Sequence, residues 1–160
     1  MVQQKLSTPD ELFHFQLRSA TTMEKHSLEA LGELRAAAKD AKIKKLFRHH
    51  SDETREQIEN LSKAFALLEW KESSAPHPAT TGISKQAASL LERTAGKLHN
   101  QVALTSALGN EHFEISAYQA MILQARSLDL GEVAELLTAN LDQETHTSEE
   151  LYSTLEELLA

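Results

Sequence analysis

The sequence predicts an all-α protein built as a bundle of four long helices. Three features of its 160 residues indicate this fold class: it has only 5 Gly and 3 Pro, only 5% of it is aromatic, and it is rich in Ala, Leu, Glu, Lys and Gln. Few turn formers and many strong helix formers favour long helices with few connections. An all-β fold needs more Gly, Pro and β-branched residues, so the composition argues strongly against one. The length fits a single domain over residues 1–160.

Two helices are expected in the first seventy residues. The first begins after Thr8, where a hydroxyl N-cap is followed by Pro9, and its apolar pattern continues to about Ala38. The second is expected from about Asp40, a suitable N-cap, to about Trp70. One continuous helix is the competing interpretation, since the turn between them is weakly marked. We reject it because a single amphipathic helix of that length could not bury its own apolar face.

The rest of the chain predicts two more long helices after a loop. Residues 71–82 hold the only concentrated loop signal, a cluster of Ser, Pro and Gly in which His77 is expected to be exposed. The elements expected after this loop are a short helix over about 84–93 and long helices over about 95–126 and 132–159.

The lengths of the connections predict the topology of the bundle. Short turns join the first helix to the second and the third to the fourth, so each of these pairs should be antiparallel. The long connection lets the second and third helices run parallel. This is the up-down-down-up arrangement of ferritin-like bundles, with a short helix carried in the crossover.

Charge and composition exclude several classes of function. With 24 acidic and 16 basic residues the formal net charge is −8, whereas nucleic-acid binding needs a basic face. The lack of Cys removes disulfides, thiolate catalysis and Cys-ligated metal sites. No apolar run reaches the roughly 20 residues of a membrane span, and the first fifteen residues show no secretory signal. We therefore expect a cytoplasmic protein with no nucleic-acid or membrane partner.

Each predicted helix carries one glutamate where its own heptad period calls for an apolar residue. On the first helix, for example, the carboxylate lies seven residues after Leu17 and seven before Leu31. All four lie near mid-length, so a four-helix bundle would bring them to one layer. These residues are Glu24, Glu53, Glu111 and Glu144.

Four carboxylates in an apolar layer would repel one another and lose their hydration. Two bound iron or manganese ions would resolve this, as in di-iron and di-manganese bundles. Any one of these glutamates alone is better explained as lying at the edge of the apolar stripe with its carboxylate in water. The matched height of all four is what favours a metal centre.

Other side chains near these positions are further candidates. Glu114 lies three residues after Glu111 and could be a fifth carboxylate ligand. His50, one turn before Glu53, fits a nitrogen ligand and a buried, hydrogen-bonded histidine equally well. Gln57 could donate a hydrogen bond to Glu53, whereas Tyr118 is interpreted as a core aromatic.

The usual Glu-x-x-His pattern of dinuclear bundle sites is missing. The third residue after Glu53 is Glu56, and the third after Glu144 is Thr147. His146 lies on a different helix face from Glu144. The remaining histidines show no paired spacing that requires a metal.

Two segments resemble a known family. His50–Ile58 is similar to the H-x-x-E-T-x-x-Q-I element, and Glu111–Tyr118 to the E-x-[FY]-E-I-x-x-Y element, of the bacterial YciF/YciE-type ferritin-like proteins. Met23–Lys25 and Glu144 match weaker positions of the first and fourth helices. The resemblance implies a rubrerythrin-related bundle, a homodimer, a role in bacterial stress and a dinuclear metal site. The metal residues that follow are Glu24, Glu53, Glu111, Glu114 and Glu144, with His50 as a further member.

Two functions remain open. The first is a dinuclear iron or manganese protein that reacts with oxygen or peroxide, an oxidoreductase of the ferroxidase or peroxidase kind; no catalytic residue beyond the metal ligands is assigned. The second is a non-enzymatic stress or interaction module in which the metal site is vestigial or structural. The absence of Glu-x-x-His favours the second, and the matched carboxylates favour the first.

Overall fold

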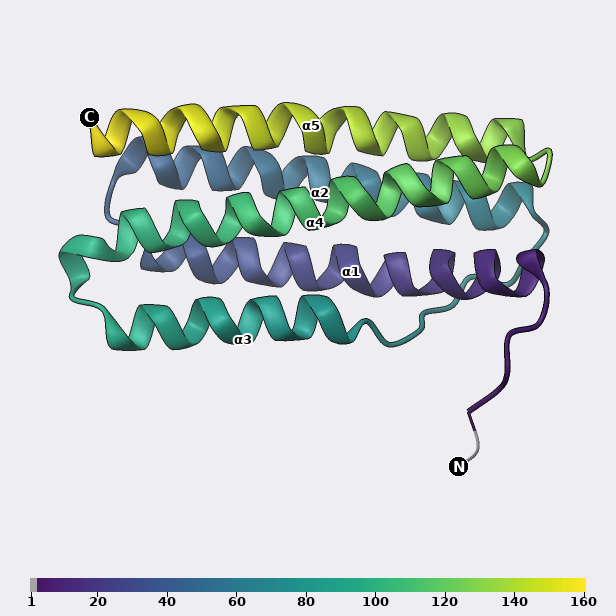
Figure 1. Ribbon diagram of the computed structural model, residues 1–160. Coiled ribbons are helices and arrows are strands. Elements are labelled where there is room, and N and C mark those ends of the chain that lie inside the picture. Colours follow the sequence, from purple (N-terminus) through teal and green to yellow (C-terminus); the bar gives the residue numbers. More distant parts are fainter. Residues whose placement is uncertain (1–2) are drawn as a thin grey trace.

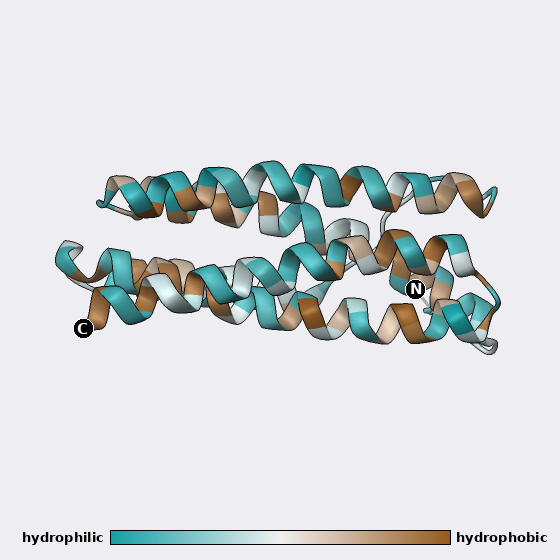
Figure 2. Ribbon diagram, turned by 90° about the horizontal axis from the view of Figure 1, so that it is seen from above, coloured by the Kyte–Doolittle hydropathy of each residue, from teal (hydrophilic) through white to brown (hydrophobic). Residues whose placement is uncertain are grey.

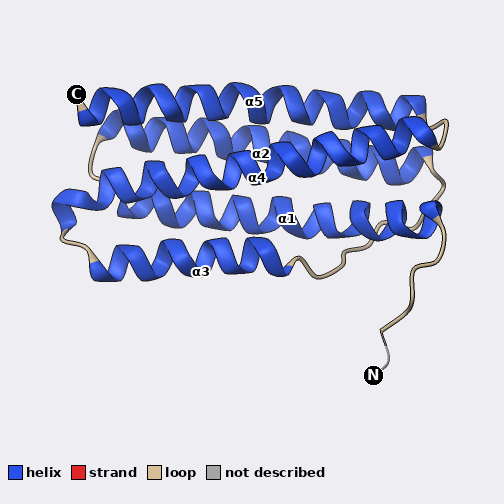
Figure 3. Ribbon diagram, viewed as in Figure 1, coloured by secondary structure: helices blue, strands red, loops and turns tan. Residues whose placement is uncertain are grey.

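The computed structural model describes residues 3–160, and within this range every regular element is a helix (Figures 1 and 3). None of the helices in this range is both long and apolar enough to cross a membrane. The elements are α1 (Pro9–Ala37), α2 (Ala41–Leu67), α3 (Pro78–Arg93), a 3₁₀ turn η1 (Gly96–Leu98), α4 (His99–Ser127) and α5 (Gly131–Leu159).

The four long helices form a square in which α1 contacts α2 and α4, and α5 contacts α2 and α4. Neighbouring helices are antiparallel, while α2 and α4 run in the same direction across the diagonal (Figure 1). The crossover helix α3 lies outside the square and packs against α1 and α4. This arrangement confirms the predicted ferritin-like up-down-down-up bundle with a helix in its long crossover.

The first two helices are separate because each has its own cap. The Thr8 hydroxyl accepts a hydrogen bond from the Glu11 amide at 3.1 Å, and the Glu11 carboxylate accepts one from the Thr8 amide at 3.2 Å. The Asp40 carboxylate accepts from the amides of Lys42 and Ile43 at 2.7 and 3.2 Å. These bonds satisfy amides that a helix start leaves without intrahelical partners. This part of the chain therefore forms two separate helices, as predicted, and not one long helix.

The second helix ends three residues earlier than the sequence predicts. Glu69 adopts a left-handed conformation with φ 56°, and the Trp70 amide donates to the Phe65 carbonyl at 3.0 Å. Such a left-handed residue closes a helix by satisfying its last carbonyls. It is usually Gly, so Glu at this position gave no stop signal in the sequence.

The crossover helix begins earlier than predicted, and His77 is not exposed. α3 starts at Pro78 rather than near residue 84, because His77 is its N-cap: the ring nitrogen Nδ1 accepts from the Thr80 amide at 3.3 Å. His77 is half-buried, with its ring edge-on to Phe113. Pro suits the first turn of a helix as well as a loop, so the cluster read as loop contains the helix start. The next long helix, α4, instead begins later than predicted: it follows η1 and starts at His99, four residues after the expected position.

The core consists of two apolar clusters separated by a polar layer. One cluster contains Phe13, Leu17, Phe65 and Leu137, and the other contains Leu31, Phe47, Leu104 and Leu151. Figure 2 shows hydrophilic and apolar residues alternating along the helices. The buried polar residues between the clusters include Glu24, His50, Gln57, Glu111, Glu114, Asn140, Glu144 and Thr147.

Candidate metal centre

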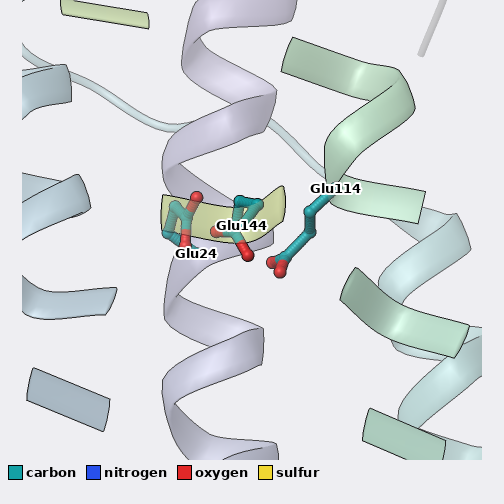
Figure 4. A group of neighbouring side chains, drawn as sticks. All are labelled: Glu24, Glu114 and Glu144. Atoms are coloured by element: carbon teal, nitrogen blue, oxygen red, sulfur yellow. The ribbon is translucent and has the colours of Figure 1, made fainter. Parts of the chain in front are cut away.

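Three carboxylates from three helices converge in the polar layer. Glu24 of α1, Glu114 of α4 and Glu144 of α5 each place one carboxylate oxygen within 4.8 Å of the others. Figure 4 shows their side chains pointing toward one another. Their exposed fractions are 0%, 0% and 3%, so none of them reaches water through its own surface.

A fourth buried carboxylate, that of Glu111, lies one helical turn before Glu114 and shares a hydrogen bond with Glu144. The four carboxylates have too few hydrogen-bond donors around them. Oε2 of Glu24, Oε2 of Glu111 and both oxygens of Glu114 are buried without a partner. Buried polar atoms are nearly always hydrogen-bonded, so this concentration of unpartnered acceptors requires an explanation.

The acid groups of this layer resist ionisation. Burial raises the pKa of Glu24, Glu111 and Glu114 well above the usual range, and the negative charge of Glu144 raises each of them further. Burial also raises the pKa of Glu144, while hydrogen bonds from Glu111 and Gln57 act in the opposite direction. Without a cation, the layer therefore retains protons that exposed carboxyls would have lost at neutral pH.

A chain of hydrogen bonds holds Glu24 in place. The Tyr118 hydroxyl donates to Oε1 of Glu24 and accepts from the Asn140 amide at 3.1 Å. The Asn140 carbonyl in turn accepts from the Asn60 amide at 2.8 Å. Tyr118 is fully buried, which agrees with its interpretation as a core aromatic. Because its hydroxyl occupies one oxygen of Glu24, the other oxygen is left free.

The second helix contributes differently from what the sequence predicts. Glu53 is not among the three converging carboxylates; it lies at the edge of the layer and accepts from His49 Nε2 at 2.6 Å and from the Thr147 hydroxyl at 3.1 Å. Gln57 is fully buried, and its side chain hydrogen-bonds Glu144 rather than Glu53. The α2 side chain that faces the converging carboxylates is thus an amide.

His50 is buried but is not seen in contact with the converging carboxylates. Its Nδ1 lies 3.1 Å from the Thr147 hydroxyl, and its Nε2 faces Glu150 at 3.8 Å. Burial lowers the pKa of His50 to about 4, with a smaller contribution from the neighbouring His49, so its ring is neutral at pH 7.

Sequence reasoning missed two polar residues of the layer. Asn140 and Thr147 lie four residues before and three after Glu144, so they share its helix face. Both are buried, and each hydrogen-bonds a side chain that the sequence did single out. The same interruption of the apolar period that marks Glu144 could have found them.

The donor set fits a cation with a preference for oxygen ligands. Carboxylate oxygens that are buried without a hydrogen-bond partner are what Mn²⁺ or Fe²⁺ would satisfy, since carboxylates bind hard and borderline divalent ions. No imidazole contacts the three converging carboxylates in the described part of the chain.

Comparison with known proteins relates the chain to one family and one fold. Residues 8–160 match the family model described as "Domain of unknown function (DUF892)". Protein YciF of Escherichia coli (strain K12) is 27% identical over 144 residues, covering 89% of this chain and 87% of YciF.

Solved structures agree with this relationship. YcfI from Rhodopseudomonas palustris superposes with a TM-score of 0.91 at 26% identity, covering 95% of this chain and 98% of YcfI. The E. coli stress protein YciF gives 0.88 at 25% identity, with 94% and 96% covered. Symerythrin from Cyanophora paradoxa gives 0.69 at 21% identity, with 99% and 90% covered, and so shares the fold.

Proposed function

This chain belongs to the DUF892 family, and from that premise we propose that it holds a dinuclear iron or manganese centre between its long helices. The observation that carries the proposal is the convergence of Glu24, Glu114 and Glu144, buried, from three helices. Folding such a group without a cation costs free energy, because charged or unpartnered carboxyls are removed from water. A bound pair of divalent ions offsets that cost.

The ligands of this centre are the four buried carboxylates, with Glu53 at its edge. Glu144 would be the central ligand of this group, because it lies beside both Glu24 and Glu114 and shares a hydrogen bond with Glu111. Tyr118 positions Glu24 so that one oxygen faces the centre. We leave His50 out of this ligand set because its contacts are with Thr147 and Glu150.

The chemistry proposed for the centre is reaction with oxygen or peroxide. We place this reaction in the bacterial stress response, because the related E. coli protein YciF is described as a stress protein. Two bound ions would supply the electrons for that reaction. The protein's own part is to bury the ions, to exclude bulk water and to hold the carboxylates in register. We further propose that the chain acts in the cytoplasm as a homodimer.

Metal content tests this proposal directly. We expect about two Fe or Mn ions per chain after anaerobic reconstitution of the purified protein with Fe(II) or Mn(II), by the logic of two-metal sites. Glu24→Gln together with Glu144→Gln should abolish this binding, whereas Glu149→Gln, at an exposed position on α5, should not. A wild-type protein that stays metal-free after reconstitution would refute the dinuclear centre.

A second candidate function is a stress or interaction module whose metal site is vestigial or structural. It is favoured by one observation: three residues after Glu144, where such sites usually have histidine, stands Thr147, which hydrogen-bonds Glu53. Oxidation of Fe(II) by peroxide separates the two functions. If the wild type and the Glu24→Gln, Glu144→Gln variant oxidise Fe(II) at equal rates while the wild type binds metal, the second function holds.

A further inference from the structure

A small cavity lies beneath the crossover helix α3, which packs against both α1 and α4. Its volume is about 20 Å³, and all three helices contribute to its wall. A cavity needs about 10–15 Å³ to hold a water molecule, so this one admits a molecule of about that width. The side chains that line it include Ser27 of α1, Ile83, Ser84 and Ala87 of α3, and Asn110 and Glu111 of α4.

The inner wall of this cavity belongs to the carboxylate layer. Glu111, which lines it, is only 3% exposed, and its Oε2 is buried without a hydrogen-bond partner. Nδ2 of Asn110 donates to the Ser27 hydroxyl at 3.3 Å, and both of these side chains lie near Glu114. A molecule in the cavity is therefore next to one carboxylate of the layer and close to a second.

The outer wall, formed by α3, is packed more loosely than the rest of the bundle. Thr80 is the one buried residue of α3, whereas each of the four long helices has eight or nine. The two ends of α3 are tied to the bundle: the Thr80 hydroxyl lies 2.9 Å from Nδ1 of His26, and Nε2 of His99 donates to the Leu91 carbonyl at 3.1 Å.

Between these two ties, α3 faces the cavity through side chains that are only half-buried, those of Ile83, Ser84 and Ala87. An element with few buried apolar contacts opens locally at a lower free-energy cost than a packed core helix. The middle of α3 can therefore move outward while the four long helices stay folded, which gives solvent molecules a path to Glu111.

We propose that this cavity is the entry and selection site for the oxidant of the carboxylate centre, and that it admits hydrogen peroxide but excludes organic hydroperoxides. The inference rests on the proposed function, because it concerns access to the same centre. Ser27, Ser84 and Asn110 supply hydroxyl and amide groups that donate and accept hydrogen bonds. Hydrogen peroxide is neutral and also donates and accepts, whereas an alkyl or aryl group on one of its oxygens is too wide for this space.

Ala87 is the residue that sets the width of the opening, and Ala87→Leu tests it with Ala88→Leu as the matched control. Both positions lie on α3, but Ala87 lines the cavity and Ala88 is exposed. Both variants should bind as much Fe(II) as the wild type. Nitric oxide, a neutral diatomic probe, should bind to the Fe(II)-loaded Ala87→Leu chain roughly tenfold more slowly than to the wild type or to Ala88→Leu, as expected for a closed gate. Equal rates in the two variants would overturn the entry site.

The selection by size has a test of its own. In the Fe(II)-loaded wild type, hydrogen peroxide should oxidise the bound iron faster than cumene hydroperoxide does. Ile83→Ala removes bulk from the outer wall and should bring the two rates closer together. A ratio of rates that is the same in the wild type and in Ile83→Ala would contradict selection at this cavity.

A measurement on the metal-free protein separates the cavity from the proposed metal centre. The side-chain amide protons of Asn110 should show a nuclear Overhauser effect from a water held in the cavity, and Ala87→Leu should abolish it while Ala88→Leu keeps it. Ser84→Val, which adds less bulk, replaces Ala87→Leu if circular dichroism shows that leucine disrupts the fold. A wild type that binds no Fe(II) refutes the dinuclear centre and the role in access with it. Normal Fe(II) binding with an unchanged nitric oxide rate and an unchanged water signal in Ala87→Leu refutes the entry site alone.

Discussion

Replacing Glu114 by Gln should stabilise the metal-free protein and abolish metal binding at the same time. Glu114 is fully buried, and neither of its oxygens has a hydrogen-bond partner. Burial raises its pKa well above the usual range, and the charges of Glu144 and Glu24 add to that effect, while the nearby polar side chains of Ser27 and Asn110 act more weakly in the opposite direction. Gln keeps the shape of the side chain, cannot ionise, and offers an amide N–H to the neighbouring carboxylates.

The magnitude follows from the cost of an unpartnered buried group, about 1–3 kcal/mol and more when it is charged. We expect Glu114→Gln to raise the free energy of unfolding of the metal-free protein by about 1–3 kcal/mol at pH 8. At pH 5 the gain should be smaller, because the raised pKa keeps the wild-type carboxyl protonated there and removes the charge.

The assay is urea unfolding in EDTA at pH 5 and pH 8, repeated with Mn(II) in place of EDTA. Mn(II) at 100 times its Kd should stabilise the wild type by about 2.7 kcal/mol. The variant should show little of this gain, and Glu149→Gln should behave as the wild type. A Glu114→Gln protein less stable than wild type at pH 8 in EDTA, or equally stabilised by Mn(II), would refute the reasoning.

Three further outcomes follow from the same layer and from the caps. Because burial raises the pKa of Glu24, Glu111 and Glu114, the folded metal-free chain holds protons that the unfolded chain loses. The free energy of unfolding should therefore fall as pH rises from about 5 to 8, by about 1.4 kcal/mol per pH unit for each proton retained. Saturating Mn(II) should remove this fall. A free energy of unfolding that does not change with pH in EDTA would contradict this expectation. Tyr118→Phe should cost about 1–3 kcal/mol, because Glu24 and Asn140 lose a partner, and should weaken Mn(II) binding in a titration. Asp40→Ala should cost about 1 kcal/mol in urea unfolding and leave Mn(II) affinity unchanged, so a changed affinity would speak against a purely capping role.

The sequence predicts the bundle well because the signals for it are local. Thr8 and Asp40 cap the helices they were expected to cap, and the apolar positions of each helix recur at helical spacing. The errors occur where one local signal fits two structures. Pro78 is compatible with a loop and with a helix start, and Glu69 closes α2 in a conformation for which its side chain gives no cue.

By itself, the sequence determined that three helices would carry buried carboxylates at one level, since on α1, α4 and α5 the interruption of the apolar period marks a buried position. It did not determine which side chain of α2 faces that level. A helix turns by about 100° per residue, so residues four apart, such as Glu53 and Gln57, lie on nearly the same face. A small error in the predicted rotation of α2 about its axis therefore exchanges one for the other. The packing of α2 against α5 places Gln57 inside and Glu53 at the edge.

The same packing decided the place of His50. Its neighbours, Thr147 and Glu150, are 97 and 100 residues away along the chain. Within one helix, spacing relates residues three or four apart because they share a face. No spacing along the chain encodes a contact between two helices, so His146 and Glu150 could not be recognised as its neighbours before the helices were packed.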